Sequence, residues 1–346
     1  MNDMRESIFV SAVRSFFTWF AAILGILLAL AAIGVGIAFV SGPTLLPKGT
    51  EMTILPDAQG NRQMLSDSAP VILRISIHGV VGIDDLTGDI IDQILLDSSD
   101  GFLKNNRIKA ILLHMDTPGG MVVDGDHIYR SLVAYKNKHS IPIYAYVDGL
   151  CASGGVYIAS AADKIYATPV SVVGSVGVIM GPLFNFSGAM DKIGIQSLTL
   201  SDGKGKDELN PFRPWEPGED QSLKAITSAL YEQFVSIVTA ARPRLDRNKL
   251  INDYGAHIFL ANEAQNLGFI DGADATYNST LQALVAAAGI QEGEAYQVVE
   301  LTPPHSFISE LTRGQSPLIT GKLSHVFQLG PMNPNLSGKF LYLYQP

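Results

Sequence analysis

The longest hydrophobic stretch of the chain lies near its N-terminus. No charged residue occurs between Ser15 and Pro47, and within residues 16–40 only Thr18 is clearly polar. A helix over residues 16–40 would be about 37 Å long, enough to cross a hydrocarbon core of about 30 Å with some tilt. The pattern predicts a transmembrane helix over residues 16–40, preceded by a short N-terminal segment, residues 1–15.

The residues that flank this helix indicate how it is oriented. Arg5 and Arg14 precede it and Lys48 follows it, which favours a cytoplasmic N-terminus. A cleaved signal peptide has an apolar core of only about 7 to 15 residues, so an uncleaved anchor is expected. The sequence therefore predicts a single-pass protein of the cell (inner) membrane, with most of the chain on the outer or periplasmic side.

Downstream of the anchor, the hydrophobic pattern changes to short alternating elements. Glycine and proline interrupt residues 41–70, which indicates a juxtamembrane linker. Strand patterns follow over residues 71–78, 108–115, 141–147 and 164–167, and helix patterns over residues 86–96, 122–135, 152–162, 219–241 and 262–267. Alternating strands and helices are typical of an α/β fold with a largely parallel sheet buried on both faces.

Composition and charge exclude several functions. The chain has 24 Lys+Arg against 33 Asp+Glu, a net charge of -9, so a nucleic-acid partner is not expected. Its single cysteine, Cys151, allows no intramolecular disulfide and no zinc site built on paired cysteines. None of its glycine-rich turns has the Gly-Lys-Ser/Thr ending of a phosphate-binding loop, and no His-Glu-x-x-His zinc motif occurs.

Three glycine-bearing turns follow predicted strands, where catalytic groups of α/β proteins collect. They are residues 116–120 (Asp-Thr-Pro-Gly-Gly), 148–155 (Asp-Gly-Leu-Cys-Ala-Ser-Gly-Gly) and 173–178 (Val-Gly-Ser-Val-Gly-Val). The second turn opens a predicted helix and places Ser153 in its first turn. Ser153 is a candidate nucleophile beside free backbone N–H groups, although a serine there more often serves as a helix cap.

A serine nucleophile requires a base, and the residues alone leave its identity open. His78 and His114 lie near strand ends, but isolated histidines are more often structural. The alternative is a lysine whose amine is neutral in an enclosed site. Lys204 and Lys206 lie in a glycine-containing loop, residues 201–207. The alternative interpretation is that both are ordinary solvated surface lysines.

The order of these motifs resembles the Ser-Lys signal peptide peptidases, SppA-like, of the ClpP/crotonase fold. The resemblance covers residues 71–301 and leaves residues 302–346 as a C-terminal extension. It rests on the first glycine turn together with five further motifs, namely residues 152–155 (Ala-Ser-Gly-Gly), 161–165 (Ala-Ala-Asp-Lys-Ile), 174–179 (Gly-Ser-Val-Gly-Val-Ile), 203–207 (Gly-Lys-Gly-Lys-Asp) and 211–214 (Pro-Phe-Arg-Pro). Each motif is weak by itself, but their order and spacing are specific.

The resemblance implies a role for each site residue. Ser153 is expected to be the nucleophile and Lys206, just before Asp207, the general base, with Lys204 the less favoured candidate. Ser175 is expected to hold the lysine. The backbone N–H groups of Gly120 and Gly154 are expected to form the oxyanion hole. This chemistry calls for no metal or cofactor.

The resemblance also implies the biological setting. The expected activity is that of a membrane-anchored serine endopeptidase that degrades signal peptides released after secretion. Because the chain carries one copy of the domain, it is similar to the short family members, which form homo-oligomeric rings, and an octamer is expected. Val156, where relatives often have Tyr, is a departure that affects the substrate groove. The alternatives are a related membrane serine protease that acts on membrane proteins, and a noncatalytic membrane scaffold.

The C-terminal tail raises a separate question. Residues 337–346 are apolar and strand-like, so they are expected to be buried. Phe340 to Tyr344 is extended and apolar like a peptide substrate, and one hypothesis is that it occupies a groove by strand addition. The alternative is an ordinary packed terminal strand, which is the more common arrangement for such a segment.

Overall fold

The structure is a computed structural model that describes residues 8–40, 50–303 and 340–344. It divides into two units: helix α1 belongs to the first, and the second begins at Thr50 and includes residues 340–344. Among the described residues, one helix, α1 (Ile8–Val40), is long and apolar enough to cross a membrane. It begins eight residues before the predicted range. Its Thr18 hydroxyl donates to the Arg14 carbonyl at 2.8 Å, so this polar group has a partner within the helix.

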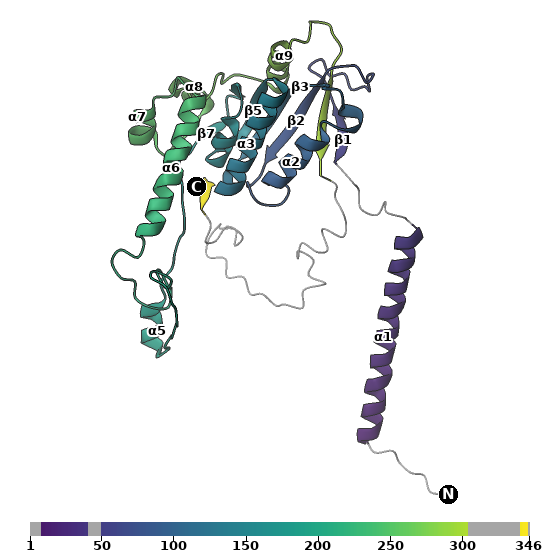
Figure 1. Cartoon of the computed structure of the whole chain (residues 1–346), viewed down its shortest axis with the longest axis vertical. Coiled ribbons are helices and arrows are strands. Elements are labelled where there is room, and N and C mark those ends of the chain that lie inside the picture. The colour runs from purple at the N-terminus through teal and green to yellow at the C-terminus, as the bar shows by residue number, and fades with distance from the viewer. Residues whose placement is uncertain (1–7, 41–49, 304–339, 345–346) are drawn as a thin grey trace. The chain divides into compact units, whose positions relative to one another are not determined.

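The described part of the second unit contains an eight-stranded sheet (Figure 1). Its order is β1-β9-β2-β3-β5-β7-β8, with β6 also paired to β5. The strands from β9 to β7 are parallel, and β1 and β8 are antiparallel to their neighbours. The strands are β1 (Glu51–Leu55), β2 (Val71–His78), β3 (Ile108–Thr117), β5 (Ile143–Ala152), β6 (Lys164–Ala167), β7 (Val172–Gly174), β8 (Ile258–Leu260) and β9 (Gln297–Thr302).

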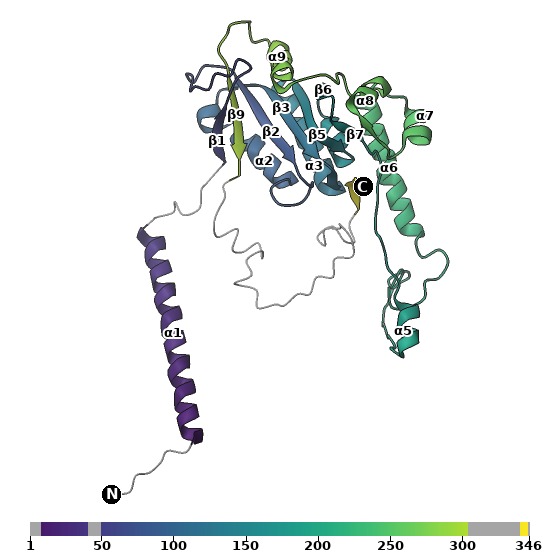
Figure 2. The same cartoon turned by 180° about the vertical axis from the view of Figure 1, so that it is seen from behind.

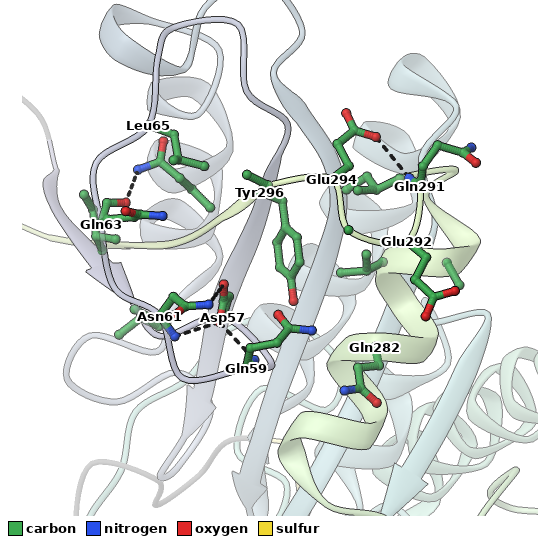
Figure 3. A pocket seen from close by; sticks show the side chains of 18 residues that line it. Asp57, Gln59, Asn61, Gln63, Leu65, Gln282, Gln291, Glu292, Glu294 and Tyr296 are labelled. Atoms are coloured by element: carbon green, nitrogen blue, oxygen red, sulfur yellow. Dashed lines mark hydrogen bonds between the residues drawn. The ribbon is translucent and has the colours of Figure 1, made fainter.

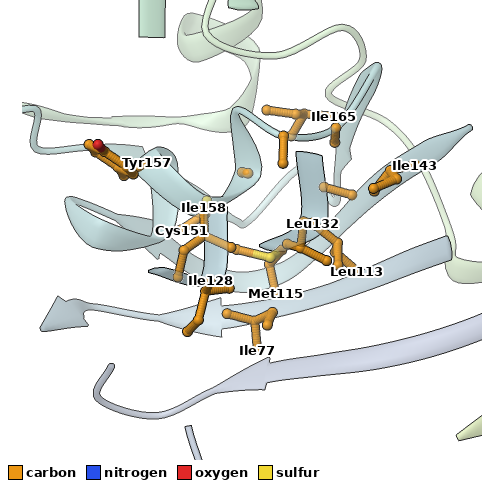
Figure 4. Packing of buried hydrophobic residues seen from close by; sticks show 14 of the residues in the cluster. Ile77, Leu113, Met115, Ile128, Leu132, Ile143, Cys151, Tyr157, Ile158 and Ile165 are labelled. Atoms are coloured by element: carbon orange, nitrogen blue, oxygen red, sulfur yellow. The ribbon is translucent and has the colours of Figure 1, made fainter. Parts of the chain in front are cut away.

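Both faces of this sheet are buried, as expected for parallel strands. Successive side chains of a strand point to opposite faces. In β2, Ile75 and Ile77 pack in a core with α2 (Gly88–Asp97), α3 (Val122–His139) and α4 (Gly154–Ala159), whereas Ile72 packs in a second core with α9 (Tyr277–Ala287). Figure 4 shows part of the first core, in which the Cys151 thiol lies among aliphatic side chains.

The α/β class predicted from the sequence is confirmed. The bounds of several strands and helices differ from the predicted ones. β2 and β6 have the predicted bounds. β5 extends through Ala152, so α4 is shorter than the helix predicted over residues 152–162. The expected linker, residues 41–70, contains β1, and β9 follows α9 without having been predicted. β1 is a partly exposed edge strand, and β9 is buried but has only a short apolar run between Gln297 and Glu300.

Residues 181–220, which we call the extension, leave the sheet between β7 and α6 (Gln221–Ala241). Figures 1 and 2 show its helix α5 (Ser187–Ile193) projecting away from the sheet. No residue of α5 is buried. The extension exposes large apolar side chains, namely Leu183, Phe184, Phe186, Ile193, Ile195, Leu198, Leu200 and Phe212. Exposed apolar surface gathered in this way is common at interaction sites.

Short elements complete the unit. Gly101–Leu103 forms one 3₁₀ turn before β3, and α7 (Arg247–Lys249) continues into a π-helical turn, Leu250–Tyr254. The predicted helix over residues 262–267 is α8 (Ala261–Leu267), and Gly268 ends it with φ 97°. Two further strands, β4 (Gly119–Met121) and β10 (Leu341–Leu343), form a separate antiparallel pair.

Candidate active site

Ser153 lies at the junction of β5 and α4 with an unusual backbone conformation. Its φ of 53° and ψ of -114° are rare for a residue with a side chain, and such strain gathers at functional sites. The Ser153 N–H donates to the Gly174 carbonyl at 2.8 Å, which holds the turn. The hydroxyl makes no cap hydrogen bond to α4 and instead points toward the Gly177 carbonyl at 3.5 Å. Ser153 therefore occupies the N-cap position of α4, but its side chain does not cap the helix.

The first glycine turn is fixed by backbone hydrogen bonds on one side. The Gly119 carbonyl accepts from Val81 N–H at 2.8 Å, and Met121 N–H donates to the Val81 carbonyl at 2.9 Å. Thr117 Oγ1 accepts from Gly119 N–H at 3.0 Å. These bonds leave the other edge of Gly120 for the strand that pairs with β4. The sequence singled out Gly120 but gave no role to Thr117 or Val81, although Thr117 is part of the Asp-Thr-Pro-Gly-Gly motif.

That other strand is β10, from the C-terminal tail. It runs antiparallel to β4, with Tyr342 opposite Gly120. On its second edge, Leu341 exchanges two backbone hydrogen bonds with Ile179, at 2.9 and 3.0 Å. Residues 340–344 of the tail are thus inserted between two segments of the domain by strand addition. β10 thus adds to β4 as a strand, and its Leu341 and Tyr342 are also buried, so the choice between a bound peptide mimic and a packed terminal strand remains a prediction.

The inserted strand places a peptide carbonyl at the predicted oxyanion donors. A methyl group on Gly154 would lie 3.0 Å from the Tyr342 carbonyl oxygen and 3.3 Å from the Gly120 nitrogen, and one on Gly119 would collide with the same carbonyl. The Tyr342 oxygen therefore lies in a cradle made by Gly119, Gly120 and Gly154. Ser153, next to Gly154, adjoins this cradle.

Ser175 lies close behind Ser153. It has φ 59°, it is buried, and its N–H donates to the His257 carbonyl at 2.7 Å. Gly174, which precedes it, accepts the Ser153 N–H. The structure thus brings Ser153, Ser175, Gly120 and Gly154 into one region.

The two candidate lysines lie elsewhere in the chain. Lys204 and Lys206 are exposed in the extension. Within the part of the chain that the structure describes, no hydrogen bond joins either amine to Ser153 or Ser175. The assignment of Lys206 as the base remains a prediction.

The loop that carries Lys206 is fixed by an arginine. Arg213 Nε donates to Asp207 Oδ2 at 2.6 Å and Arg213 Nη1 to Glu219 Oε1 at 2.6 Å. The hydrogen bond from Arg213 lowers the pKa of Asp207, and the same kind of bond lowers the pKa of Glu219 to about 2. Arg213 belongs to the Pro-Phe-Arg-Pro motif, to which the sequence assigned no role.

The two histidines considered as bases lie on the other face of the sheet. His114 Nε2 lies 2.8 Å from Asp148 Oδ2, and its ring contacts the ring of Tyr277 in α9. The His78 and His114 rings are 4.5 Å apart between centroids, and burial lowers the pKa of His78. Because Ser153 opens α4, which covers the opposite face, neither histidine is placed to serve it.

A cavity of about 760 Å³ lies apart from these residues (Figure 3). It is lined by the loop after β1 and by the end of α9 with the start of β9, and most labelled side chains are amides or carboxylates. None of the predicted site residues lines it. Its position gives it no part in chemistry at Ser153.

Comparison with known proteins identifies the family. The family described as Peptidase family S49 matches residues 135–290. A Synechocystis sp. protein described as a protease is 30% identical over 247 residues, which cover 70% of this chain and 87% of that protein. The chain belongs to peptidase family S49. The matched S49 region contains Ser153, Ser175 and Lys206, whereas Gly120 precedes it.

Other relatives match over shorter parts. An Enterococcus faecium protein described as a signal peptide peptidase SppA is 29% identical over 206 residues, which cover 58% of this chain and 59% of that protein. The chain thus spans less than two thirds of the length of this relative. Among solved structures, a mutant ClpP1 from Listeria monocytogenes aligns with a TM-score of 0.40 at 17% identity, covering 60% of this chain and 94% of that one.

Proposed function

We propose that this S49 protein is a serine endopeptidase whose nucleophile is Ser153 and whose oxyanion donors are the N–H groups of Gly120 and Gly154. One observation carries the proposal: a strand in the cleft presents its Tyr342 carbonyl to the glycine cradle beside the strained Ser153. Donors fixed where negative charge develops are a major source of catalysis in acyl transfer.

The reaction uses Ser153 twice. A neutral Lys206 amine takes the hydroxyl proton as Ser153 Oγ attacks the scissile carbonyl, and the oxyanion forms in the glycine cradle. The protonated amine then gives its proton to the leaving nitrogen, and the peptide C–N bond breaks. Water then attacks the acyl ester and gives a proton to the lysine; the ester C–O bond breaks, the acid product leaves, and the lysine returns the proton to Ser153 Oγ. The Ser175 hydroxyl is a neutral partner that orients the amine without fixing it as a cation.

We propose further that Lys206 acts on Ser153 of a neighbouring subunit in a homo-oligomer, with an octamer the expected size. Two observations support this arrangement. Lys206 is exposed in the extension, and the extension displays large apolar side chains that are also exposed in the described part of the chain. In a closed ring, neighbouring subunits would cover this apolar surface, and each subunit would supply its Lys206 as the base for the Ser153 of the next.

The proposed substrates are signal peptides or other apolar peptides left in the membrane after secretion. The support is the apolar helix α1 and the apolar strand β10 in the cleft. The proposed location is the cell (inner) membrane, with the N-terminus cytoplasmic and the catalytic domain on the outer or periplasmic side.

Mixing two inactive variants tests the whole proposal. Ser153→Ala and Lys206→Ala should each abolish hydrolysis of an apolar peptide by the purified full chain, while Lys204→Ala, the matched control, should retain it. Refolded or subunit-exchanged mixtures of the two inactive variants should recover activity at about one quarter of the sites, since each active site then needs its serine and lysine from different subunits. Activity retained by Ser153→Ala would overturn the nucleophile assignment, and mixtures without activity would place both residues in one subunit.

A further inference from the structure

Strand β5, which leads to Ser153, does not pair evenly with β3 along its whole length. The pairing is regular as far as Val147, and the register then shifts, so that residues 148–150 of β5 lie opposite Asp116 alone. Before this bulge β5 pairs with β6, and after it with β7. Because a bulge redirects the strand that contains it, this one directs the end of β5, and Ser153 after it, toward β7.

The Asp116 side chain provides a hydrogen-bond acceptor that the bulge removes. Asp116 Oδ1 accepts from the Leu150 N–H at 2.9 Å. In a regular parallel pair, a backbone carbonyl of the neighbouring strand would accept such a bond, whereas a bulge interrupts the ladder. The carboxylate therefore takes the place of a main-chain acceptor and fixes the last residue of the bulge, three residues before Ser153.

The middle residue of the bulge, Gly149, leaves space for this carboxylate. A methyl group on Gly149 would lie 2.4 Å from Asp116 Oδ1 and 2.7 Å from Asp116 Cγ, and its three nearest atoms all belong to this one side chain. The φ of Gly149 is not positive, so its backbone conformation does not itself require glycine. The position lacks a side chain because the Asp116 carboxylate lies against it.

A second carboxylate in the bulge makes a different contact. Asp148 Oδ2 lies 2.8 Å from His114 Nε2, and the His114 ring contacts the rings of His78 and Tyr277. This contact joins two side chains and holds no backbone group of β5. Asp148 is therefore a matched comparison for Asp116: it has the same charge and lies in the same bulge, but it lacks the bond to the strand.

We infer that Asp116 is a positioning residue for Ser153, because its carboxylate sets the register in which β5 enters α4. The inference rests on the proposed function, in which Ser153 is the nucleophile. Asp116 touches no reacting atom and acts through the backbone between Leu150 and Ser153, whose N–H donates to the Gly174 carbonyl of β7. Displacing a catalytic group by about 1 Å can lower the rate by about 100-fold, so the register of this segment matters for the reaction.

The same glycine turn thus serves both halves of the site. Residues 116–120 contain Asp116 at one end, which holds the strand of the nucleophile, and Gly120 at the other, a proposed oxyanion donor. Because both groups belong to one turn of five residues, the separation between Ser153 and that donor depends on the Asp116 contact.

The test measures peptide hydrolysis by the full chain in detergent. Asp116→Ala should lower kcat by about 10- to 100-fold, the effect of losing a hydrogen bond to a charged acceptor. KM should change by less than about threefold, because the edge of β4 that binds a strand is unaltered. Asp116→Asn keeps an oxygen acceptor and should retain kcat within about fivefold. Asp148→Ala, the matched control, should retain kcat within about threefold.

Three results would be decisive against these assignments. Unchanged kcat in Asp116→Ala would overturn the inference. An equal loss in Asp116→Asn, or in Asp148→Ala, would also overturn it, since the charge and not the hydrogen bond would then matter. If the unaltered chain hydrolysed no peptide, the proposed function would fail instead.

Gly149→Ala tests the same contact without removing the carboxylate. The added methyl should displace Asp116 and lower kcat by about 10- to 100-fold. In the double variant Gly149→Ala/Asp116→Ala the methyl meets no carboxylate, so kcat should be no lower than in Asp116→Ala; losses that multiply would contradict the inference.

Hydrogen exchange at the Leu150 amide follows the contact directly and needs no activity. The amide should exchange about tenfold faster in Gly149→Ala and in Asp116→Ala, and at its original rate in Asp148→Ala. An unchanged rate in both altered contacts would overturn the inference. If Asp116→Ala does not fold, Gly149→Ala and Asp116→Asn decide the matter by the same two measurements.

Discussion

Replacing Tyr342 with alanine should release the tail strand while the sheet stays folded. The ring is fully buried between Tyr157 and Phe234, and its hydroxyl donates to the Leu230 carbonyl. Truncating a buried aromatic side chain costs about 3 to 5 kcal/mol. Because β10 has only three residues, we expect this loss to fall on tail docking and not on global stability. Docking should weaken by about 10²- to 4 × 10³-fold.

Hydrogen exchange on the full chain measures this effect without assuming any activity. The amides of Leu341 and Tyr344 donate to the carbonyls of Ile179 and Pro118, at 2.9 and 2.8 Å. In Tyr342→Ala both amides should exchange about 10²- to 4 × 10³-fold faster. Amides of β2 and β3 should keep their original rates. Tyr344→Ala, which alters a half-buried ring that the aromatic contacts of Tyr342 do not include, should change the rates far less.

Two outcomes would refute this reasoning. If the tail amides remained as protected as before, the Tyr342 side chain would not hold the strand. If β2 and β3 lost protection together with the tail, Tyr342 would belong to the cooperative core of the domain and not to a docked strand.

Two further predictions concern the glycine turn and the extension. Gly119→Ala should destabilise the domain by about 1 to 3 kcal/mol in urea unfolding, because Gly119 has φ +88° and an added methyl would crowd the Gly154 nitrogen at 2.5 Å; unchanged stability would contradict the geometry. Since Arg213 holds the pKa of Glu219 at about 2, below its ordinary 4.5, this contact stabilises the loop above about pH 4.5 and is lost as the pH falls toward 2. Trp215 fluorescence in a Trp19→Phe background should change over that window, and Glu219→Gln should show the acid spectrum already at pH 7; a flat profile would contradict the assignment.

Local sequence patterns predicted the central strands but not the edges. β2 and β6 were found at their expected bounds because an apolar run enclosed by polar or turn residues is a local signal. β1 and β9 depend on pairing with each other and with β2 across long separations in the chain, which no local window contains. The same limit explains why β5 was read as ending before residues 148–152.

Some residues of the candidate site were also predictable from local sequence, and others were not. Gly120, Gly154 and Ser153 lie in motifs where the chain must turn tightly, so glycine patterns reveal them. The lysine could not be placed, because Lys206 is exposed in its own chain and its surroundings depend on what covers the extension. The surroundings of Tyr342 could not be predicted either, because they combine residues of α3, α4, α6 and the tail that are far apart in the sequence.

The inserted tail also has a consequence for how the protein responds to concentration. Because β10 belongs to the same polypeptide as β4, it competes for the cleft at an effective concentration on the order of mM, which does not change when the protein is diluted. A peptide that binds weakly from solution would lose this competition at any enzyme concentration. On the proposed function, peptides gathered in the plane of a membrane reach local concentrations that free peptides do not, and the tail would act as a threshold that separates the two.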